Sequence, residues 1–220
     1  VSRGLGDVYK RQDVDNLFEY MALEMFVGNS DIGNIRYYRL HQEGSKWKWI
    51  WYDADYGLYS SKFNSPWSYM KVKGMGEQKI DNTIFLKLLE HPDYKRKFLE
   101  KLADVYKTFT TEYMTQVLDG VVAEIQPEMK NHWERWGELN DKAVTSEVPT
   151  TIDGAYTYWE SRVNRLYNTL KVRPHRLWDF IKDEFKLTKT EMEELFGAKV
   201  NLQCWIKVKE DWRNRQGLLT

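Results

Sequence analysis

The chain has 220 residues, which is enough for one large domain that buries a hydrophobic core. Its 33 lysine and arginine residues equal its 33 aspartate and glutamate residues, so no overall charge draws it toward nucleic acid or acidic lipid. We therefore expect no nucleic-acid partner. The single cysteine, Cys204, excludes an internal disulfide and any zinc site built from several cysteines.

The two ends of the sequence differ in character from its middle. Residues 1–12, VSRGLGDVYKRQ, look like adaptor sequence translated at the end of an assembled metagenomic reading frame, and we predict that they are a non-native leader. Residues 197–220 alternate like a strand over 200–208 and show no evident ending, which predicts the start of a truncated β segment. No apolar run in the chain is as long as a membrane span, so we expect none in this fragment.

The first predicted element is a helix over residues 14–26. Its apolar residues recur at helical spacing, and Asp13 or Asp15 can accept the backbone N–H groups that the first turn leaves free. Gly28 and Asn29 follow the last apolar residue and predict the end of the helix.

A β-hairpin is predicted after a short polar loop. Residues 35–40 and 46–52 alternate and are rich in aromatic residues, with a Gly-Ser turn between them. The second strand leads directly into Asp-Ala-Asp-Tyr-Gly at 53–57. Residues 60–79 are rich in Ser, Gly, Pro and Trp without sustained periodicity, which predicts a long functional loop.

The rest of the chain is predicted to be helical, so the fold class expected is α+β, mainly α, with a small antiparallel hairpin followed by a helical bundle. A polar connector is expected over 139–149, and Thr188 with Glu191 forms a capping-box pattern. The predicted helices cover residues 83–90, 93–107, 111–123, 127–137, 152–170, 174–185 and 188–196.

The candidate site follows from the order of these elements. Asp31 and Asn34 lie in the loop after the first helix, and Asp55 follows the second strand, with Asp53 as a further carboxylate. A hairpin between them brings groups that are distant in sequence onto one patch, where a cation that prefers oxygen ligands can meet nucleotide phosphates. Protein kinases place a catalytic-loop Asp, a loop Asn and a magnesium-binding Asp in this order. Asp31 and Asn34 are closer in sequence than in the protein-kinase motif, and no His-Arg precedes Asp31.

At these residues the chain resembles the spore coat protein H (CotH) family of atypical kinases. The resemblance is looser downstream and covers about residues 13–196. It is carried by Val14-Asp15-Asn16-Leu17 with Tyr20, by Gly28-Asn29-Ser30-Asp31, by Asn34 with Tyr37-Tyr38-Arg39, by Lys46-Trp47, and by Tyr52-Asp53-Ala54-Asp55-Tyr56-Gly57, and then by Phe85 to Leu89, Pro92 to Tyr94, His132-Trp133 with Arg135-Trp136, and Arg173-Pro174.

The resemblance implies a kinase-like C-lobe over residues 13–196 that uses ATP and Mg²⁺ to phosphorylate serine or threonine of a protein substrate. By position, Asp31 would be the catalytic aspartate, Asn34 and Asp55 would bind the cofactor, and Asn34, Asp53 and Asp55 would hold the metal. Family members carry a nucleotide-clamping N-lobe upstream of the point where this chain begins, so we expect the fragment alone to be inactive. A bacterial spore coat, or a secreted or cell-surface location, is the expectation that the family suggests.

Two other functions stay open at this point. A pseudokinase-like surface or coat module would keep the same residues for scaffolding and would show no metal-dependent nucleotide binding. A glycoside hydrolase would use Asp53 and Asp55, or Asp31 and Asp55, as paired carboxylates, with Trp67 as a platform for sugar. Trp67 and Tyr69 lie in the long loop, where they are candidates for contact with a peptide substrate.

Overall fold

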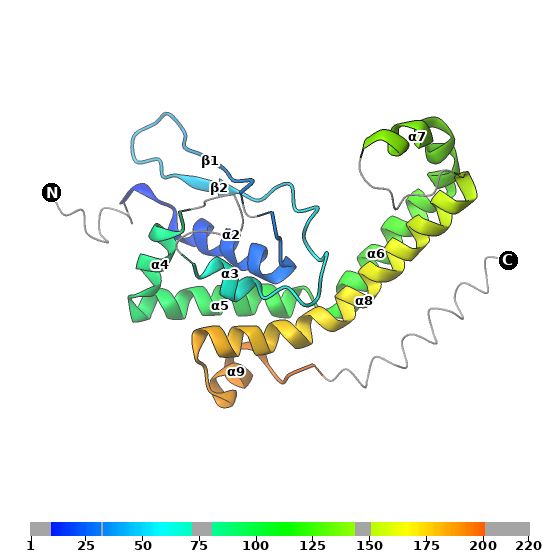
Figure 1. Ribbon diagram of the computed structural model, residues 1–220. Helices are drawn as coiled ribbons and strands as arrows, with labels where there is room; N and C mark the ends of the chain where they lie inside the picture. The colour runs from blue at the N-terminus through cyan, green and yellow to red at the C-terminus, as the bar shows by residue number, and fades with distance from the viewer. Residues whose placement is uncertain (1–9, 32, 72–80, 144–150, 201–220) are drawn as a thin grey trace. The chain divides into compact units, whose positions relative to one another are not determined.

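The computed structural model describes residues 10–31, 33–71, 81–143 and 151–200 (Figure 1). The elements form two compact units, unit 1 from residues up to Phe109 together with those from Val172 onward, and unit 2 from Thr110 to Lys171. The structure is mainly helical with one two-stranded antiparallel sheet, which confirms the predicted fold class. In chain order the elements are α2 (Val14–Val27), β1 (Arg36–Tyr38), β2 (Lys48–Ile50), α3 (Ser65–Tyr69), α4 (Thr83–Leu89), α5 (Pro92–Thr108), α6 (Thr111–Ile125), the 3-10 helix η1 (Gln126–Glu128), α7 (Met129–Ala143), α8 (Ile152–Phe185) and α9 (Lys189–Phe196).

The helix α2 begins and ends as its sequence predicts. The Asp13 carboxylate accepts the backbone N–H of Asn16 at 3.1 Å, which satisfies one donor of the first turn. Gly28 adopts a left-handed conformation, with φ of 64°, and its N–H bonds to the carbonyl of Glu24. The chain therefore leaves α2 at a fixed angle into the loop that contains Asp31.

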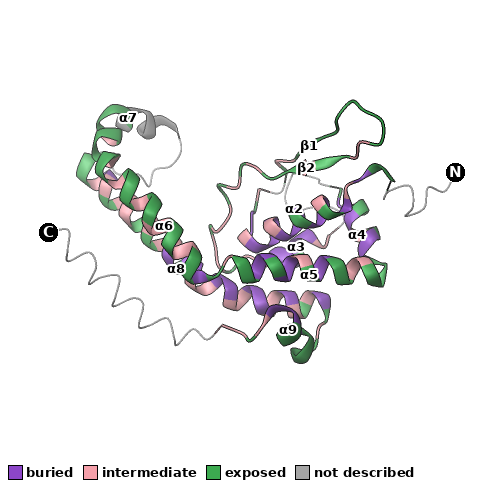
Figure 2. Cartoon of the chain, turned by 180° about the vertical axis from the view of Figure 1, so that it is seen from behind, coloured by how far each residue is buried: buried purple, intermediate pink, exposed green. Residues whose placement is uncertain are grey.

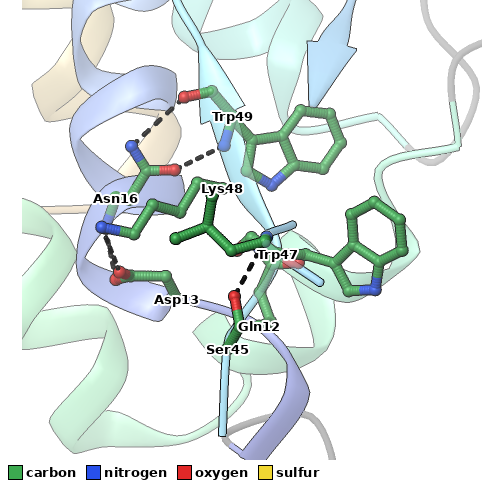
Figure 3. A network of polar contacts seen from close by, with 8 residues as sticks. Gln12, Asp13, Asn16, Ser45, Trp47, Lys48 and Trp49 are labelled. Atoms are coloured by element: carbon green, nitrogen blue, oxygen red, sulfur yellow. Dashed lines mark hydrogen bonds and ion pairs between the residues drawn. The ribbon is translucent and has the colours of Figure 1, made fainter. Parts of the chain in front are cut away.

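The hairpin is shorter than predicted, and it is attached to α2. Tyr37 pairs with Trp49 in the middle of the antiparallel register. Figure 3 shows the Asn16 side chain against β2, where its amide accepts the N–H of Trp49 and donates to the carbonyl of Trp49 at 3.2 Å. Gln12 is buried and donates to the carbonyl of Trp47 at 3.1 Å (Figure 3). These contacts fix the strand that leads into residues 53–57.

The core of unit 1 is aromatic and lies between helices α2, α4, α5 and the C-terminal part of α8. Phe18, Phe85 and Phe98 are buried and pack edge to face, with ring centroids of Phe85 and Phe98 4.9 Å apart. Figure 2 shows buried residues, in purple, on α2, α4, α5 and the C-terminal part of α8. Burial of each such ring contributes roughly 1.5–3 kcal/mol, so this core holds α2 firmly beneath its loop.

The expected long loop contains a short helix. The side chain of Asn64 caps α3 by accepting the N–H of Trp67 at 3.1 Å, and Pro66 fits the first turn because a free N–H is not needed there. The prediction of an irregular segment was therefore wrong for Ser65–Tyr69. Residues 72–80 of the expected loop lie outside the described residues.

The two helices expected over 152–170 and 174–185 are one helix, α8. Pro174 has no N–H to give to the carbonyl of Leu170, and a missing bond of this kind usually breaks or kinks a helix. The hydroxyl of Thr111 donates to that carbonyl at 3.1 Å instead. The helix therefore continues because another side chain satisfies the group that proline leaves free.

Unit 2 pairs α6 with the first part of α8, and the two helices run side by side in both views (Figures 1 and 2). The hydroxyl of Tyr167 donates to Asp119 at 2.6 Å, and Gln126 donates to the hydroxyl of Tyr156 at 2.9 Å. The helix α7 continues to Ala143, so the connector expected from residue 139 begins later than predicted.

Two predictions fall partly outside the described residues, namely the strand over 200–208 and the leader over residues 1–12, of which only 10–12 are described. The capping box of α9 is confirmed, since Thr188 and Glu191 exchange both hydrogen bonds. Among the residues that can be described, no helix combines the length and the apolar character needed to cross a membrane.

Candidate functional site

Two loops of unit 1 meet through the side chain of Asn34. Its amide nitrogen donates to the carboxylate of Asp53, and its amide oxygen accepts the hydroxyl of Tyr52. Asp53 has a positive φ of 52°, which turns the chain sharply at the end of the strand region. The loop after α2 and the segment after β2 are thus joined side chain to side chain.

The turn that contains Asp55 is held on the end of α2. The N–H of Gly57 bonds to the carbonyl of Ala54 at 2.8 Å, and the N–H of Leu58 bonds to the carbonyl of Val27 at 2.6 Å. A Cβ on Gly57 would lie 2.8 Å from the carbonyl oxygen of Ala54 and 3.1 Å from the Val27 side chain. Glycine at 57 therefore permits the close approach that brings this turn to the last residue of α2.

The structure places the four predicted site residues on these two loops with different exposures. Asp31 and Asn34 are half-buried, whereas Asp53 and Asp55 are exposed. Asn34 and Asp53 are brought into contact. Within the described part of the chain, neither Asp31 nor Asp55 forms a side-chain hydrogen bond with that pair, and no group of three or more His, Cys, Asp or Glu side chains lies close enough to hold a metal ion.

The atoms offered at this junction are the kind that a hard cation binds. The Asn34 amide oxygen has two lone pairs and gives one to Tyr52, and the carboxylates of Asp53 and Asp55 are oxygen ligands. Mg²⁺ usually binds one or two carboxylates together with phosphate oxygens and keeps several waters. Asn34, Asp53 and Asp55 therefore fit a magnesium nucleotide by donor type.

A buried carboxylate lies directly beneath the loop. Glu24, in the last turns of α2, is 2% exposed, and its carboxylate accepts the hydroxyl of Tyr69 at 2.7 Å. Burial raises the pKa of Glu24 above its usual value, because desolvation of the charged form outweighs the favourable effect of Tyr69 and of the nearby polar side chains of Asn29, Tyr20 and Trp51, which lower it. Burial, together with the negative charge of Glu24, also raises the pKa of the Tyr69 hydroxyl.

A short chain of hydrogen bonds connects Glu24 to Asp31. The hydroxyl of Tyr69 contacts the Glu24 carboxylate at 2.7 Å and the carbonyl of Asn29 at 3.2 Å. The side-chain oxygen of Asn29, itself a buried residue, accepts the backbone N–H of Asp31 at 3.1 Å. This last contact is an Asx turn, in which a side chain fixes the backbone two residues later.

The other buried charge near this loop is Arg173 of α8. Its guanidinium donates to the carbonyls of Met25 and Phe26, at 2.9 and 3.2 Å, and to the carbonyl of Phe63. Burial lowers the pKa of Arg173 to about 10, so the group is still charged at neutral pH. The positive charge lies at the C-terminal end of α2, where the helix dipole favours a cation.

Sequence reasoning missed Glu24, and it gave Arg173 no role. A signal for Glu24 was present, since it follows Tyr20 by four positions and Leu17 by seven, which places a carboxylate on the apolar face of α2. Tyr52 was noted only as part of the motif around Asp53. The structure adds its hydroxyl as the partner that orients Asn34.

Comparison with known proteins gives one match over most of the chain. The model of the family described as CotH kinase protein matches residues 6–177. The matched range includes α2, both loops of the candidate site, the hairpin and Arg173. No solved structure matches the chain.

Curated relatives match only a short stretch. The GTPase Era of Alkaliphilus oremlandii (strain OhILAs) is 50% identical over 34 residues, which is 16% of this chain and 12% of that protein. The GTPase Era of Clostridioides difficile (strain 630) is 47% identical over 34 residues, or 16% of this chain and 11% of that protein. The GTPase Era of Alkaliphilus metalliredigens (strain QYMF) is 44% identical over 39 residues, which is 18% of this chain and 13% of that protein. The chain thus spans 11 to 13% of the length of these relatives.

Proposed function

Because the chain belongs to the CotH kinase protein family, we propose that its site transfers phosphate from magnesium-bound ATP to serine or threonine of a protein substrate. The observation that carries this proposal is the junction of the two loops. Asn34 bonds to Asp53, and the turn around Asp55 is held on Val27, so oxygen ligands from distant parts of the sequence share one small region. Phosphoryl transfer needs this kind of positioning more than it needs covalent chemistry from the protein.

In this proposal some residues of the site bind the metal and others hold those residues in position. Asn34, Asp53 and Asp55 would hold Mg²⁺, which neutralises charge on the phosphates when bound. Tyr52 would keep the Asn34 amide in one orientation, since its hydroxyl occupies one lone pair of the amide oxygen and leaves the other free. The close approach at Gly57 keeps the Asp55 turn against α2.

Asp31 would act on the acceptor hydroxyl. Its carboxylate accepts a hydrogen bond from the serine or threonine hydroxyl, which orients that oxygen toward the terminal phosphorus of ATP. The bond from the acceptor oxygen to phosphorus forms, the bond from phosphorus to the bridging oxygen of ADP breaks, and Asp31 takes the proton. Trp67, an exposed side chain of α3, is a candidate for contact with the peptide around the acceptor.

The test is magnesium-dependent ATP binding by calorimetry, on the chain extended upstream to include the N-lobe that family members carry, with the site then located by Mn²⁺. Mn²⁺ with ATP should broaden the backbone NMR signals of Asn34, Asp53 and Asp55 in the unmodified chain. Asp55→Ala should lose both the calorimetric heat and the broadening. Asp183→Ala is the matched control, because Asp183 is an exposed aspartate on α8, and its removal should change neither result.

Two outcomes would count against the proposal. Binding that is equal in the unmodified chain and in Asp55→Ala would remove Asp55 from the site. Absence of nucleotide binding with and without Mg²⁺, with the N-lobe present, would favour one of the two other functions considered above, the pseudokinase-like scaffolding module. A phosphorylated protein substrate, and its place in a spore coat or at a cell surface, are further predictions that depend on the first result.

A further inference from the structure

The Asn29 side chain lies between Glu24 and Asp31, and its amide can satisfy both neighbours in only one orientation. Asp31 donates its N–H to the Asn29 side-chain oxygen at 3.1 Å, so the NH₂ group of the same amide is the part that can act as a donor toward the nearby Glu24. Tyr69 donates to Glu24 from the other side, at 2.7 Å. An amide that gave its NH₂ to Asp31 instead would place two donors against each other. The acceptor at Glu24 therefore sets the orientation of Asn29, and Asn29 sets the backbone at Asp31.

The chemistry around Glu24 requires a group that only accepts. Tyr69 donates to it at 2.7 Å, and the polar side chains of Asn29, Tyr20 and Trp51 lie near it, of which the indole of Trp51 has a donor and no acceptor. A carboxylate has about four lone-pair positions and can accept from several such donors at once. A carboxamide of the same shape would have one oxygen and would turn its NH₂ toward at least one of these donors.

We propose that Glu24, Tyr69 and Asn29 are positioning residues for Asp31, holding the catalytic loop in the geometry that orients the acceptor hydroxyl. The catalytic part of this inference rests on the proposed function, in which Asp31 orients the acceptor hydroxyl. None of the three residues belongs to the set proposed for Mg²⁺, so their effect should fall on turnover and leave nucleotide affinity unchanged. The charged groups around the loop include Glu24 of α2, Asp31 of the loop itself, Asp53 after β2 and Arg173 of α8.

The structural part of the proposal is tested on the full chain by hydrogen exchange, followed by NMR. In Glu24→Gln the Asp31 amide should exchange about tenfold faster, because its hydrogen bond to Asn29 is lost. The Gly28 amide, which bonds to the backbone carbonyl of Glu24, should keep its protection. Unchanged exchange at Asp31 would overturn the proposal whatever the activity.

A milder variant covers the case in which Glu24→Gln does not fold. Tyr69→Phe removes the hydroxyl that donates to Glu24 and keeps the ring, so a smaller acceleration at Asp31 is expected. Tyr106→Phe is its matched control, since Tyr106 is also a buried tyrosine whose hydroxyl donates to a carbonyl, that of Pro174 at 3.2 Å. The control should leave Asp31 exchange unchanged, and equal effects of the two variants would overturn the proposal.

The catalytic part is tested by separating turnover from binding. Glu24→Gln should lower kcat for phosphate transfer to a serine-containing peptide on the order of tenfold to a hundredfold. The dissociation constant for magnesium-bound ATP should stay the same. Faster exchange at Asp31 with unchanged kcat would overturn the positioning role. These kinetic measurements use the chain extended upstream to include the N-lobe that family members carry. If this extended protein neither binds nor turns over ATP, the proposed function itself is overturned. The exchange rate of the Asp31 amide would then still decide whether Glu24, Tyr69 and Asn29 hold the backbone at Asp31.

Discussion

At the scale of single residues, the end of α2 depends on a glycine that a larger residue cannot replace. Gly28 has a φ of 64°, and a Cβ built on it would lie 2.8 Å from the Nη2 atom of Arg173. The guanidinium cannot move away without giving up its bonds to the carbonyls of Met25 and Phe26. Two separate costs, backbone strain and collision with a buried cation, therefore apply to any side chain at this position.

Gly28→Ala and Gly44→Ala separate these two costs. Gly44 also has a positive φ, of 75°, but a Cβ there would meet nothing within 4 Å. Gly44→Ala should therefore lower the free energy of unfolding by the cost of the left-handed conformation, about 1–2 kcal/mol. Gly28→Ala should lower it further, as measured by chemical denaturation. An equal decrease in the free energy of unfolding of the two variants would mean that the Arg173 side chain moves aside for the added methyl group without a measurable cost.

At the scale of elements, α8 shows how a helix passes through a proline. Pro174 removes one bond of the helix, and the carbonyl of Leu170 would be buried without a partner if Thr111 did not donate to it. The carbonyl of Pro174 in turn accepts the hydroxyl of Tyr106 at 3.2 Å. Side chains from other helices thus complete the hydrogen bonding of α8 at its weakest point.

A double-mutant cycle tests this compensation. Thr111→Val should lower the free energy of unfolding by about 1–3 kcal/mol, since the Leu170 carbonyl is left buried and unpaired. Adding Pro174→Ala restores an N–H at position 174, which can bond to the same carbonyl, so the double variant should recover much of the loss. Strictly additive effects in thermal or chemical denaturation would contradict this account.

At the scale of the whole molecule, unit 1 is built from two separate segments of the chain. The first ends at Phe109, and the second begins at Val172, immediately before Arg173. Arg173 donates to carbonyls at Met25, Phe26 and Phe63 of the first segment. One fully buried side chain therefore attaches the returning segment to the helix and loop that support the candidate site.

Arg173→Met should strongly destabilise unit 1. The thioether fills part of the space but donates no hydrogen bond, and each carbonyl left unpaired costs about 1–3 kcal/mol. We expect the free energy of unfolding to fall by about 3 kcal/mol or more. Arg96→Met is the control, because Arg96 is exposed and pairs with Glu100 within one helix, and its loss should be within about 0.5 kcal/mol. A small effect of Arg173→Met would show that water can replace the guanidinium.

The sequence predicted most of the regular structure because its signals are local. Periodicity and caps identified α2, and alternation identified the hairpin that joins Asp31 to Asp55 in sequence order. Contacts between segments could not be predicted in this way. The bond from Asn34 to Asp53 depends on how the loops fold back, and the continuity of α8 at Pro174 depends on a threonine far away in the chain.

The roles of the predicted site residues stay predictions. The structure also explains why the sequence pattern did not reveal the buried residues that support the site. The motif pointed to polar residues on loops, because such residues follow the helix and the strand directly. The buried supports were missed because a carboxylate at Glu24 and a guanidinium at Arg173 are costly inside a protein unless several partners meet them. Those partners include Asn29, Tyr69 and the carbonyls at the end of α2, and sequence spacing does not show them.

The attachment of the hairpin to α2 also closes the outer edge of β2 to another strand at Trp47 and Trp49. A strand at the edge of a sheet offers unpaired N–H and C=O groups on which another chain can add a strand. The outer edge of β2 is occupied at Trp49 by the Asn16 side chain, and at Trp47 by the backbones of Arg11 and Asp13. Asn16 thus takes the place of a neighbouring strand, and any strand that extends this sheet toward an aggregate must add at β1.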